Sequence, residues 1–111
     1  MNAEERFGRL VEEFARLPDV EAPTASGGRR FGSDALKVNG SIFAMVTGGH
    51  LVLKLPRDRV RALIESGAGA TFAAGKKRPM QEWLTVVDDD EETCLALAHE
   101  ALSFVRAKPR T

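Results

Sequence analysis

Apolar and polar residues alternate between Phe31 and Leu55 with the period of two that is typical of β-strands. Two pairs of turn residues, Asn39-Gly40 and Gly48-Gly49, interrupt this alternation. Both residues of a two-residue type I′ turn need positive φ, which glycine adopts freely and asparagine tolerates. The stretch therefore predicts three antiparallel strands joined by two tight turns.

Two-residue turns fix the strand pairing and sort the side chains onto two faces of the sheet. Across the first turn we expect Val38, Lys37 and Leu36 to face Ser41, Ile42 and Phe43. One face is almost wholly apolar, and we predict that helices cover it: Ile42, Ala44, Val46, Leu51, Leu53 and Leu55, with Lys37 as its only charge. The other face is mixed, and we predict that it is covered only in part: Leu36, Val38, Phe43, Met45, Val52, Lys54 and His50.

Three other segments place apolar residues at helical spacing. The first is capped by Asn2 and stopped at Leu17 by Pro18. The second begins at Pro56 and ends before Gly67, and the third follows the run 88–92, whose last aspartate is its cap. The predicted buried stripes are Phe7, Leu10, Val11, Phe14 and Leu17 in the first helix, Val60, Leu63 and Ile64 in the second, and Leu95, Ala98, Leu102 and Val105 in the third.

Three weaker segments complete the pattern. Residues 20–24 predict a short edge strand, because Pro23 cannot donate to a ladder. Residues 70–73 predict a weak strand, and residues 83–87 predict a strand beside the meander or paired with Thr71-Phe72. This order of elements favours an α+β fold, in which N-terminal and C-terminal helices cover an antiparallel β-meander. We expect one domain over residues 1–107 and a frayed tail over 108–111.

The composition of the 111 residues is that of a globular protein, with 43% hydrophobic and 29% charged residues. Sixteen lysines and arginines balance sixteen acids, whereas a dedicated duplex-DNA binder usually has excess positive charge. The single cysteine excludes an intrachain disulfide and a cysteine-based metal site. No apolar run approaches the ~20 residues of a membrane helix, and the acidic, amphipathic start is not typical of a signal peptide. We expect a cytoplasmic protein.

Known catalytic and ligand-binding patterns are missing from the sequence. The acidic run 88–92 lacks the spaced oxygen ligands and tight glycine turn of a calcium loop. Cys94 and His99 lie about 140° apart around a helix, so they do not face each other. Gly67-Ala68-Gly69 follows a helix rather than opening one, unlike a dinucleotide loop. We therefore expect a protein that is not an enzyme and that uses no cofactor and no metal.

The best candidate for a binding site is the glycine-flanked basic turn Lys76, Lys77 and Arg78, with Trp83 close by in the sequence. Such cations can contact phosphates, and an aromatic side chain beside them can stack on a base. Arg29 and Arg30 could extend the same patch. The alternative is a solvated turn, in which Trp83 is buried in the core and water or the acidic run satisfies the cations.

The stretches FGSDALKVNGSIFAMV, HLVLKLPRDRVRALIESG and FAAGKKRPMQEWLTV resemble the single-domain MmcQ/YjbR-like proteins. They are also similar to the N-terminal domain of the TfoX/Sxy competence regulators. The resemblance covers roughly residues 20–105 and implies an α+β double-wing domain that is often labelled DNA-binding or acts with transcription regulators. It implies no enzymatic activity and no cofactor. The chain departs from the YjbR pattern at Ser41, where lysine is usual, and at residues 76–80, where a His/Asn/Lys-rich run is usual.

Together these observations lead to two hypotheses of function. The first is a small non-enzymatic domain that binds nucleic acid or a DNA-bound regulator through the basic residues. The second is a protein-interaction or homodimerisation module that uses Phe43, Met45 and Val52 on the mixed face of the sheet.

Overall fold

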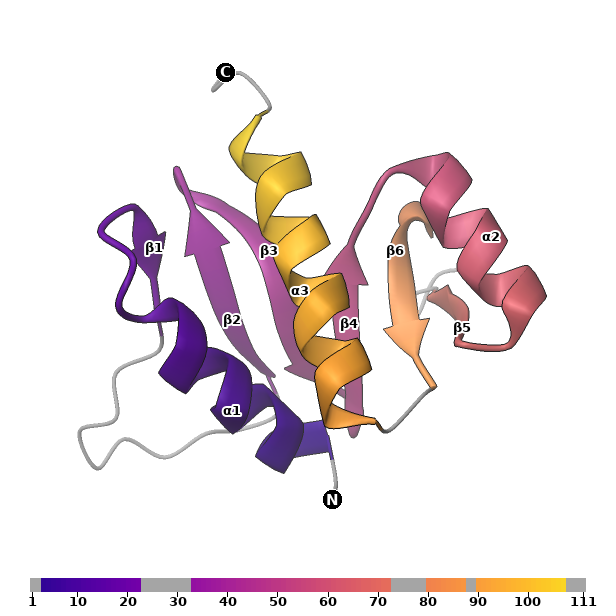
Figure 1. Cartoon of the computed structure of the whole chain (residues 1–111), viewed down its shortest axis with the longest axis horizontal. Helices are drawn as coiled ribbons and strands as arrows, with labels where there is room; N and C mark the ends of the chain where they lie inside the picture. Colours follow the sequence, from indigo (N-terminus) through magenta and orange to yellow (C-terminus); the bar gives the residue numbers. More distant parts are fainter. Residues whose placement is uncertain (1–2, 23–32, 73–79, 88–89, 108–111) are drawn as a thin grey trace.

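The computed structural model describes residues 3–22, 33–72, 80–87 and 90–107, with only the backbone described for Ser33, Asp34 and Met80. Within these residues the chain forms three helices and one six-stranded sheet (Figure 1). The helices are α1 (Ala3–Phe14), α2 (Arg57–Ser66) and α3 (Glu91–Arg106). The strands are β1 (Val20–Glu21), β2 (Ser33–Val38), β3 (Ser41–Thr47), β4 (His50–Lys54), β5 (Gly69–Phe72) and β6 (Met80–Val86).

All neighbouring strands are antiparallel, and their order across the sheet is β1-β2-β3-β4-β6-β5. The α+β class is therefore confirmed, and β1 lies at an edge as predicted. Strand β6 lies between β4 and β5, so it pairs both with the meander and with residues 69–72. It begins at Met80, three residues earlier than the sequence predicted.

Both hairpin turns have the conformation that the glycine pairs predict. Asn39 and Gly40 have φ values of 54° and 80°, and Gly48 and Gly49 have values of 58° and 80°. Positive φ at both central residues is the signature of a type I′ turn, whose twist matches that of the flanking strands. Across the second turn the pairs run from Thr47–His50 to Ala44–Leu53, the register that a two-residue loop dictates.

The register across the first turn changes at a β-bulge that the sequence analysis did not predict. Val38 pairs with Ser41 and Lys37 with Ile42, as expected, but Leu36 pairs with Ala44 rather than with Phe43. Phe43 is thus an extra residue in β3, and a bulge of this kind reverses the side on which the following residues lie.

The bulge corrects the predicted division between the two faces. Leu36, Val38 and Phe43 are fully buried in the main hydrophobic core, although they were predicted on the mixed face. Ile42, which was predicted on the helix-covered face, is only half-buried and does not belong to that core. Val52 is fully buried but also lies outside the main core, as expected for a central strand position on the opposite face.

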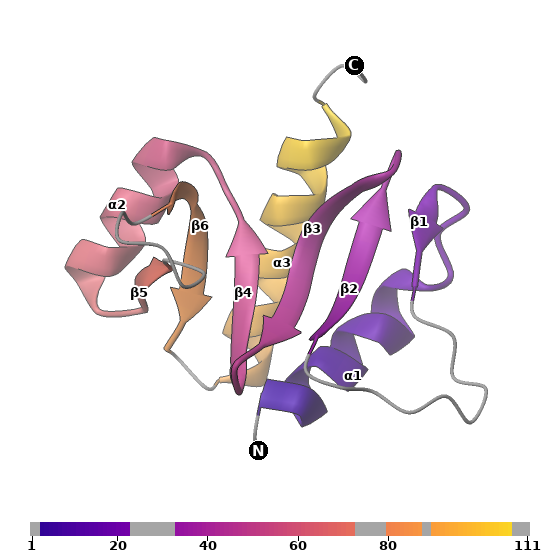
Figure 2. The ribbon, with the colours of Figure 1, turned by 180° about the vertical axis from the view of Figure 1, so that it is seen from behind.

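The helices cover one face of the sheet. Helix α3 packs against β2, β3 and β4, α1 packs against β3 and β4, and α2 packs against β5 and β6. Viewed from behind, the sheet lies in front of α1 and α3 (Figure 2). Apolar residues of all three helices belong to the same core cluster as Leu53 and Leu84. Among the described elements, no helix covers the opposite face, and we call it the open face.

The helical stripes agree with the sequence in part. Phe7, Leu10 and Phe14 are buried in α1, but the helix ends at Phe14 rather than at Leu17. Bonds such as that from the Leu17 nitrogen to the Phe14 oxygen, 3.0 Å, tighten the chain into turns before Pro18. In α3 the buried residues are Cys94, Leu97, Ala98, Ala101, Leu102 and Val105, whereas Leu95 is half-buried at the edge of the stripe.

Helix α3 is also joined to its neighbours by paired charges. The Arg59 guanidinium of α2 donates to both carboxylate oxygens of Glu100, at 2.8 and 3.0 Å. Arg106 donates in the same way to Asp19, which follows α1, at 2.8 and 3.0 Å. Exposed pairs of this kind contribute about 0–1 kcal/mol each, so the apolar core supplies most of the packing energy.

Several predictions fall outside the described residues. They are the Asn2 cap, the end of the first edge strand at Pro23 and Thr24, the basic residues Arg29, Arg30, Lys76, Lys77 and Arg78, and the tail 108–111. No helix in the described part of the chain is long and apolar enough to cross a membrane.

Candidate functional site

Trp83 is the one predicted site residue that the structure describes, and it lies on the open face in β6. Its neighbour Leu84 is fully buried in the main core, so alternation along the strand directs Trp83 to the opposite side. Its side chain is half-buried. The alternative that Trp83 belongs to the main core is therefore wrong, because the residue lies outside that cluster.

Two neighbouring side chains complete a small group around Trp83. Lys54 is its partner across β4 and β6, and the Lys54 ammonium lies 5.0 Å from the centroid of the indole ring. The ring of Phe72, from β5, lies 6.4 Å from Trp83 between centroids, tilted by 54°. A cation within about 6 Å of a ring face is attracted by the ring quadrupole. The open face thus carries two aromatic rings and a cation side by side.

A shallow recess of about 340 Å³ opens beside this group. Its walls come from three elements: the end of β4, the start of α2 and the first half of β6. The lining residues are Lys54, Arg57, Gln81, Glu82 and Trp83. One recess therefore combines an aromatic face with a primary ammonium, a guanidinium, an amide and a carboxylate.

Polar contacts hold the walls of this recess in place. Arg57 Nη1 donates a hydrogen bond of 3.0 Å to Gln81 Oε1, which ties the start of α2 to β6. Lys54 Nζ lies 3.7 Å from Glu82 Oε1. The backbone of Leu55 donates to the Glu82 carbonyl at 3.0 Å, so β4 and β6 remain paired where α2 begins. The β6 wall is irregular, because Thr71 of β5 pairs with Leu84 while the next residue, Phe72, pairs with Met80, so that Gln81, Glu82 and Trp83 fall at a register shift.

Lys54, Arg57, Gln81 and Glu82 are not among the site residues that the sequence predicts. The pairing of β4 with β6 brings them together, and strands about thirty residues apart leave no local signal of that pairing. Gln81 and Glu82 directly precede Trp83, but the sequence predicted that the strand begins at Trp83. The register of β6 is also irregular over residues 81–83, so simple alternation could not have assigned these residues to a face.

A second recess, of about 300 Å³, lies on the helix side between α1 and the first turns of α3. Three arginines and three glutamates line it, together with Leu10, Cys94 and Leu95. Two of the arginines are already matched by carboxylates, with Arg9 lying 3.1 Å from Glu91 and Arg16 lying 3.7 Å from Glu13. Balanced charge without an aromatic wall is typical of a solvated seam between helices.

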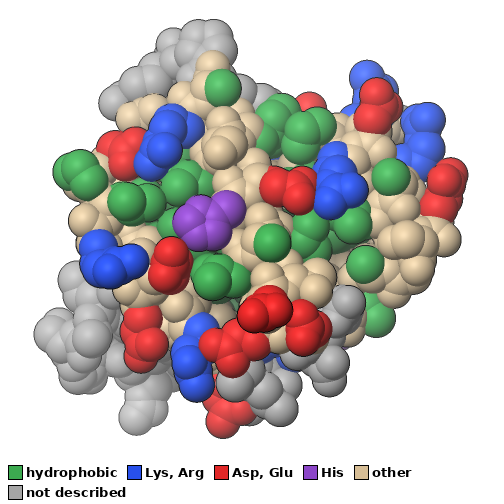
Figure 3. All heavy atoms as spheres, in the orientation of Figure 1, with side chains coloured by type: hydrophobic (Ala, Val, Ile, Leu, Met, Phe, Trp, Pro, Cys, Tyr) green, Lys and Arg blue, Asp and Glu red, His purple; other side chains and the backbone are tan. Residues whose placement is uncertain are grey.

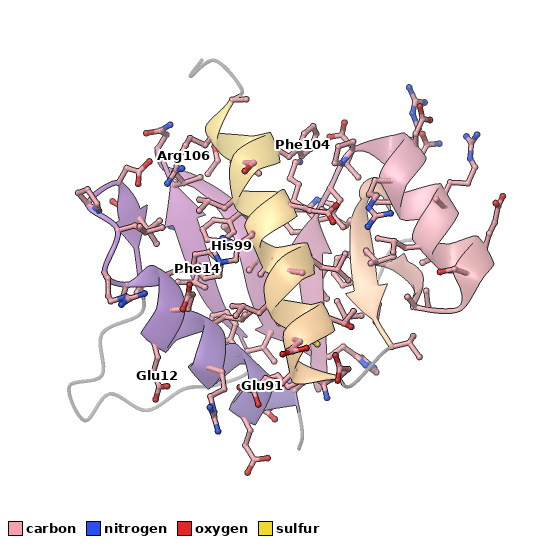
Figure 4. All side chains as sticks on the ribbon, viewed as in Figure 1. Glu12, Phe14, Glu91, His99, Phe104 and Arg106 are labelled. Carbon is pink, nitrogen blue, oxygen red and sulfur yellow. The ribbon has the colours of Figure 1, made fainter. Side chains whose placement is uncertain are left out.

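The two residues considered as a catalytic pair have separate surroundings. Cys94 is buried at 2% exposure in the α3 stripe. His99 is exposed, and its ring lies 4.7 Å from that of Phe14 while Nε2 lies 3.3 Å from a Glu13 carboxylate oxygen (Figure 4). His99 therefore belongs to the contact between α1 and α3. Among the described residues, no group of three or more His, Cys, Asp or Glu side chains is arranged to hold a metal ion.

Two described groups, Asp90 and Arg59, have shifted pKa values. Both belong to contacts of the helices, and neither lies in the recess at Trp83. The pKa of Asp90 is lowered because its carboxylate accepts hydrogen bonds from the Thr93 backbone and hydroxyl, each 2.9 Å long. The pKa of Arg59 is raised by its hydrogen bonds to Glu100. The Asp90 contacts confirm the predicted cap of α3.

Comparison with known proteins adds no relative: no family model, no curated protein and no solved structure matches the chain. The functional argument therefore depends on the arrangement of this chain's own residues.

Proposed function

We propose that this protein is a non-enzymatic binding domain that takes single-stranded nucleic acid on the open face of its sheet. The observation that carries the proposal is the group formed by Trp83, Phe72 and Lys54 on the face that no described helix covers. Proteins that bind single strands combine aromatic rings, on which bases stack, with cations that follow the backbone. Stacking contributes about 1–3 kcal/mol per base, which is enough to make two rings a useful platform.

The distribution of charge supports this proposal although the net charge is zero. Helices α1 and α3 together hold seven glutamates and three arginines of the sixteen acids and sixteen cations. The rest of the chain, which includes α2 and its three arginines on the helix side, therefore holds nine acids and thirteen cations. On the helix side of the molecule, several acidic side chains lie close together at the N-terminal end of α3, which includes Glu91 and Glu92, while others are spread over the same face (Figure 3). A phosphate chain on the open face would lie away from that acidic end.

The sequence resemblance fits the same role. An MmcQ/YjbR-like or TfoX-type double-wing domain would act in the cytoplasm, on nucleic acid or with a DNA-bound regulator. In this proposal Lys76, Lys77 and Arg78, which are close to Trp83 along the chain, contact phosphates, and Arg29 and Arg30 are further candidate phosphate contacts. Trp83 supplies the stacking.

The test is binding of a fluorescent single-stranded oligonucleotide across a salt series. The variants are Trp83→Ala and a triple change of Lys76, Lys77 and Arg78 to Ala. The control is Arg61→Ala, which removes one exposed cation of α2 outside the recess. Counterion release predicts that the triple change lowers the slope of log affinity against log salt by about one unit per lost contact. Trp83→Ala should weaken binding about five- to hundredfold with little change in slope.

Two results would oppose the proposal. One is undetectable binding at low salt, and the other is a Trp83→Ala variant that binds as tightly as the natural chain. Duplex of the same sequence provides a comparison, because stacked and paired bases cannot reach the aromatic rings.

A second candidate is homodimerisation through the same face. Met45 is half-buried on the open face, where an apolar side chain can meet a partner, whereas Val52, its partner across β3 and β4, is fully buried and cannot contribute. Phe43, which the sequence analysis included in this surface, is buried beneath the helices and cannot contribute. Light scattering distinguishes the two: a particle of about twice the 12.1 kDa chain mass, which Met45→Asp converts to a monomer, would favour the dimer.

A further inference from the structure

We propose that the recess lined by Lys54, Arg57, Gln81, Glu82 and Trp83 accepts one unpaired guanine base. This inference rests on the proposed nucleic-acid function and deepens it, because it assigns base selectivity to a site of known position. The recess is shallow and open, with a volume of about 340 Å³, so it can contact one face and the edges of a small planar group rather than enclose a ligand. The recess is thus suited to one base rather than to a run of bases.

Trp83 provides the stacking surface of the site. The Lys54 ammonium lies 5.0 Å from its ring centroid, so one face of the indole is engaged by a cation. Phe72 lies 6.4 Å away and supports the ring from the β5 side. These two contacts restrict the indole before any base arrives, which reduces the entropy lost on binding.

Glu82 and Arg57 supply the hydrogen-bonding groups that distinguish guanine. The Watson–Crick edge of guanine carries two adjacent donors, N1–H and N2–H, and a carboxylate can accept from both. Its other edge carries the acceptors O6 and N7, for which a guanidinium is the usual partner. The recess presents both of these groups. Gln81 holds Arg57 in place through the 3.0 Å hydrogen bond, and the Glu82 carboxylate, whose Oε1 lies 3.7 Å from Lys54 Nζ, would accept from the base beside that ammonium.

The other three bases fit this set of groups less well. Uracil and thymine present one donor, N3–H, between the carbonyl oxygens O2 and O4, so a carboxylate gains at most one hydrogen bond and is repelled by the flanking oxygens. Cytosine and adenine each offer one exocyclic amino group beside an acceptor nitrogen, so the carboxylate gains at most one hydrogen bond. A site that satisfies both donors of guanine should prefer it by about five- to hundredfold, the value of one good bidentate pair.

Fluorescence can report on this site alone, because Trp83 is the only tryptophan in the chain. We would titrate the protein with a short oligothymidine and with the same oligonucleotide carrying one central deoxyguanosine. The expected result is quenching by both and a preference for the guanine-containing strand of about five- to hundredfold. Equal affinity for the two strands would overturn the base assignment while leaving strand binding intact. Absence of binding to either strand would instead remove the proposed function itself.

Two variants test whether the Glu82 and Arg57 side chains select guanine. Glu82→Gln should abolish most of the guanine preference and retain affinity for oligothymidine. Arg57→Lys keeps the charge but removes the planar fork, so it should lower the preference without changing the salt slope. The matched control is Glu65→Gln, an exposed glutamate of α2 outside the recess, which should leave the preference unchanged. If Glu82→Gln and Arg57→Lys both preserve the natural preference, the recess is not the guanine site.

Discussion

Gly49 closes the second hairpin with a φ of 80°, a conformation that places the Cβ of an L-residue too close to the following carbonyl oxygen. The methyl group that Gly49→Ala adds has open space around it. Any loss of stability in this variant therefore comes from backbone strain rather than from a steric clash. We expect it to lower the free energy of unfolding in urea by about 1–2 kcal/mol.

The control for this prediction is Gly8→Ala in α1. That position is also open, but it lies in a helix, where alanine is favoured by about 1 kcal/mol. The two substitutions should therefore have opposite signs. A stabilising effect at Gly49 would contradict the turn assignment.

Asp90 makes the stability of α3 depend on pH. The pKa of Asp90 is lower in the folded chain than in the unfolded chain. Its contribution to stability is therefore fully present above the unfolded pKa of about 3.9, and it is lost as the pH falls through the folded pKa. Asp90→Ala should lower the melting temperature at neutral pH, and the difference from the natural chain should narrow below about pH 4. Asp90→Asn should retain most of the stability at neutral pH, because asparagine caps a helix about as well. A difference for Asp90→Ala that stays constant down to pH 3 would show that the cap does not titrate.

Strand β3 shows how far alternation alone predicts an element. The residues next to each turn pair as the sequence predicts, because a two-residue loop fixes their register. Because of the bulge at Phe43, the side chains of β2 lie on the opposite face of the sheet from the one that simple alternation predicts. No proline or glycine marks this position, so the sequence gives no local signal for the bulge. What places Phe43 inward is the space beneath α1, where its ring meets that of Phe14 edge to face at 5.5 Å.

The bulge predicts opposite sensitivities for two adjacent residues. Phe43→Ala should lower the free energy of unfolding by about 3–5 kcal/mol, because it leaves a cavity against Phe14 in the main core. Ile42→Ala removes a half-buried side chain outside that core, and we expect a loss of about 1 kcal/mol or less. Urea unfolding of both variants measures the difference. Simple alternation without a bulge predicts the reverse order, so the sign of the difference decides between the two registers.

At the scale of the whole molecule, local signals predicted the elements and long-range pairing determined the site. Turn glycines, the cap at Asp90 and the helical stripes are local, and they placed the three helices and the meander. The position of β6 between β4 and β5 depends on contacts between distant segments, which periodicity cannot specify. Lys54 and Gln81 therefore share a recess that no stretch of the sequence contains. Of the predicted site residues, Trp83 alone lies among the described ones, on the face opposite the helices.

Helices α1 and α3, which are rich in glutamate, lie on the other side of the sheet from the open face. A charge added to the open face should therefore affect oligonucleotide binding more than a charge added to the helices. Met45 lies on the open face, paired with Val52, which in turn pairs with Thr85 of β6. If nucleic acid lies on this face, Met45→Lys should tighten oligonucleotide binding and Met45→Glu should weaken it, each severalfold at low salt. Each change should move the salt slope by about one unit, in opposite directions.

The matched controls are Ser103→Lys and Ser103→Glu on the exposed side of α3. They add the same charges to the helix face, so they change the net charge equally but should alter affinity and slope much less. Salt screens exposed charges beyond about 10 Å at 0.1 M, and a charge on the far side of the sheet is therefore felt weakly. Equal effects at the two positions would mean that the chain responds only to net charge, and the open face would no longer be the binding surface.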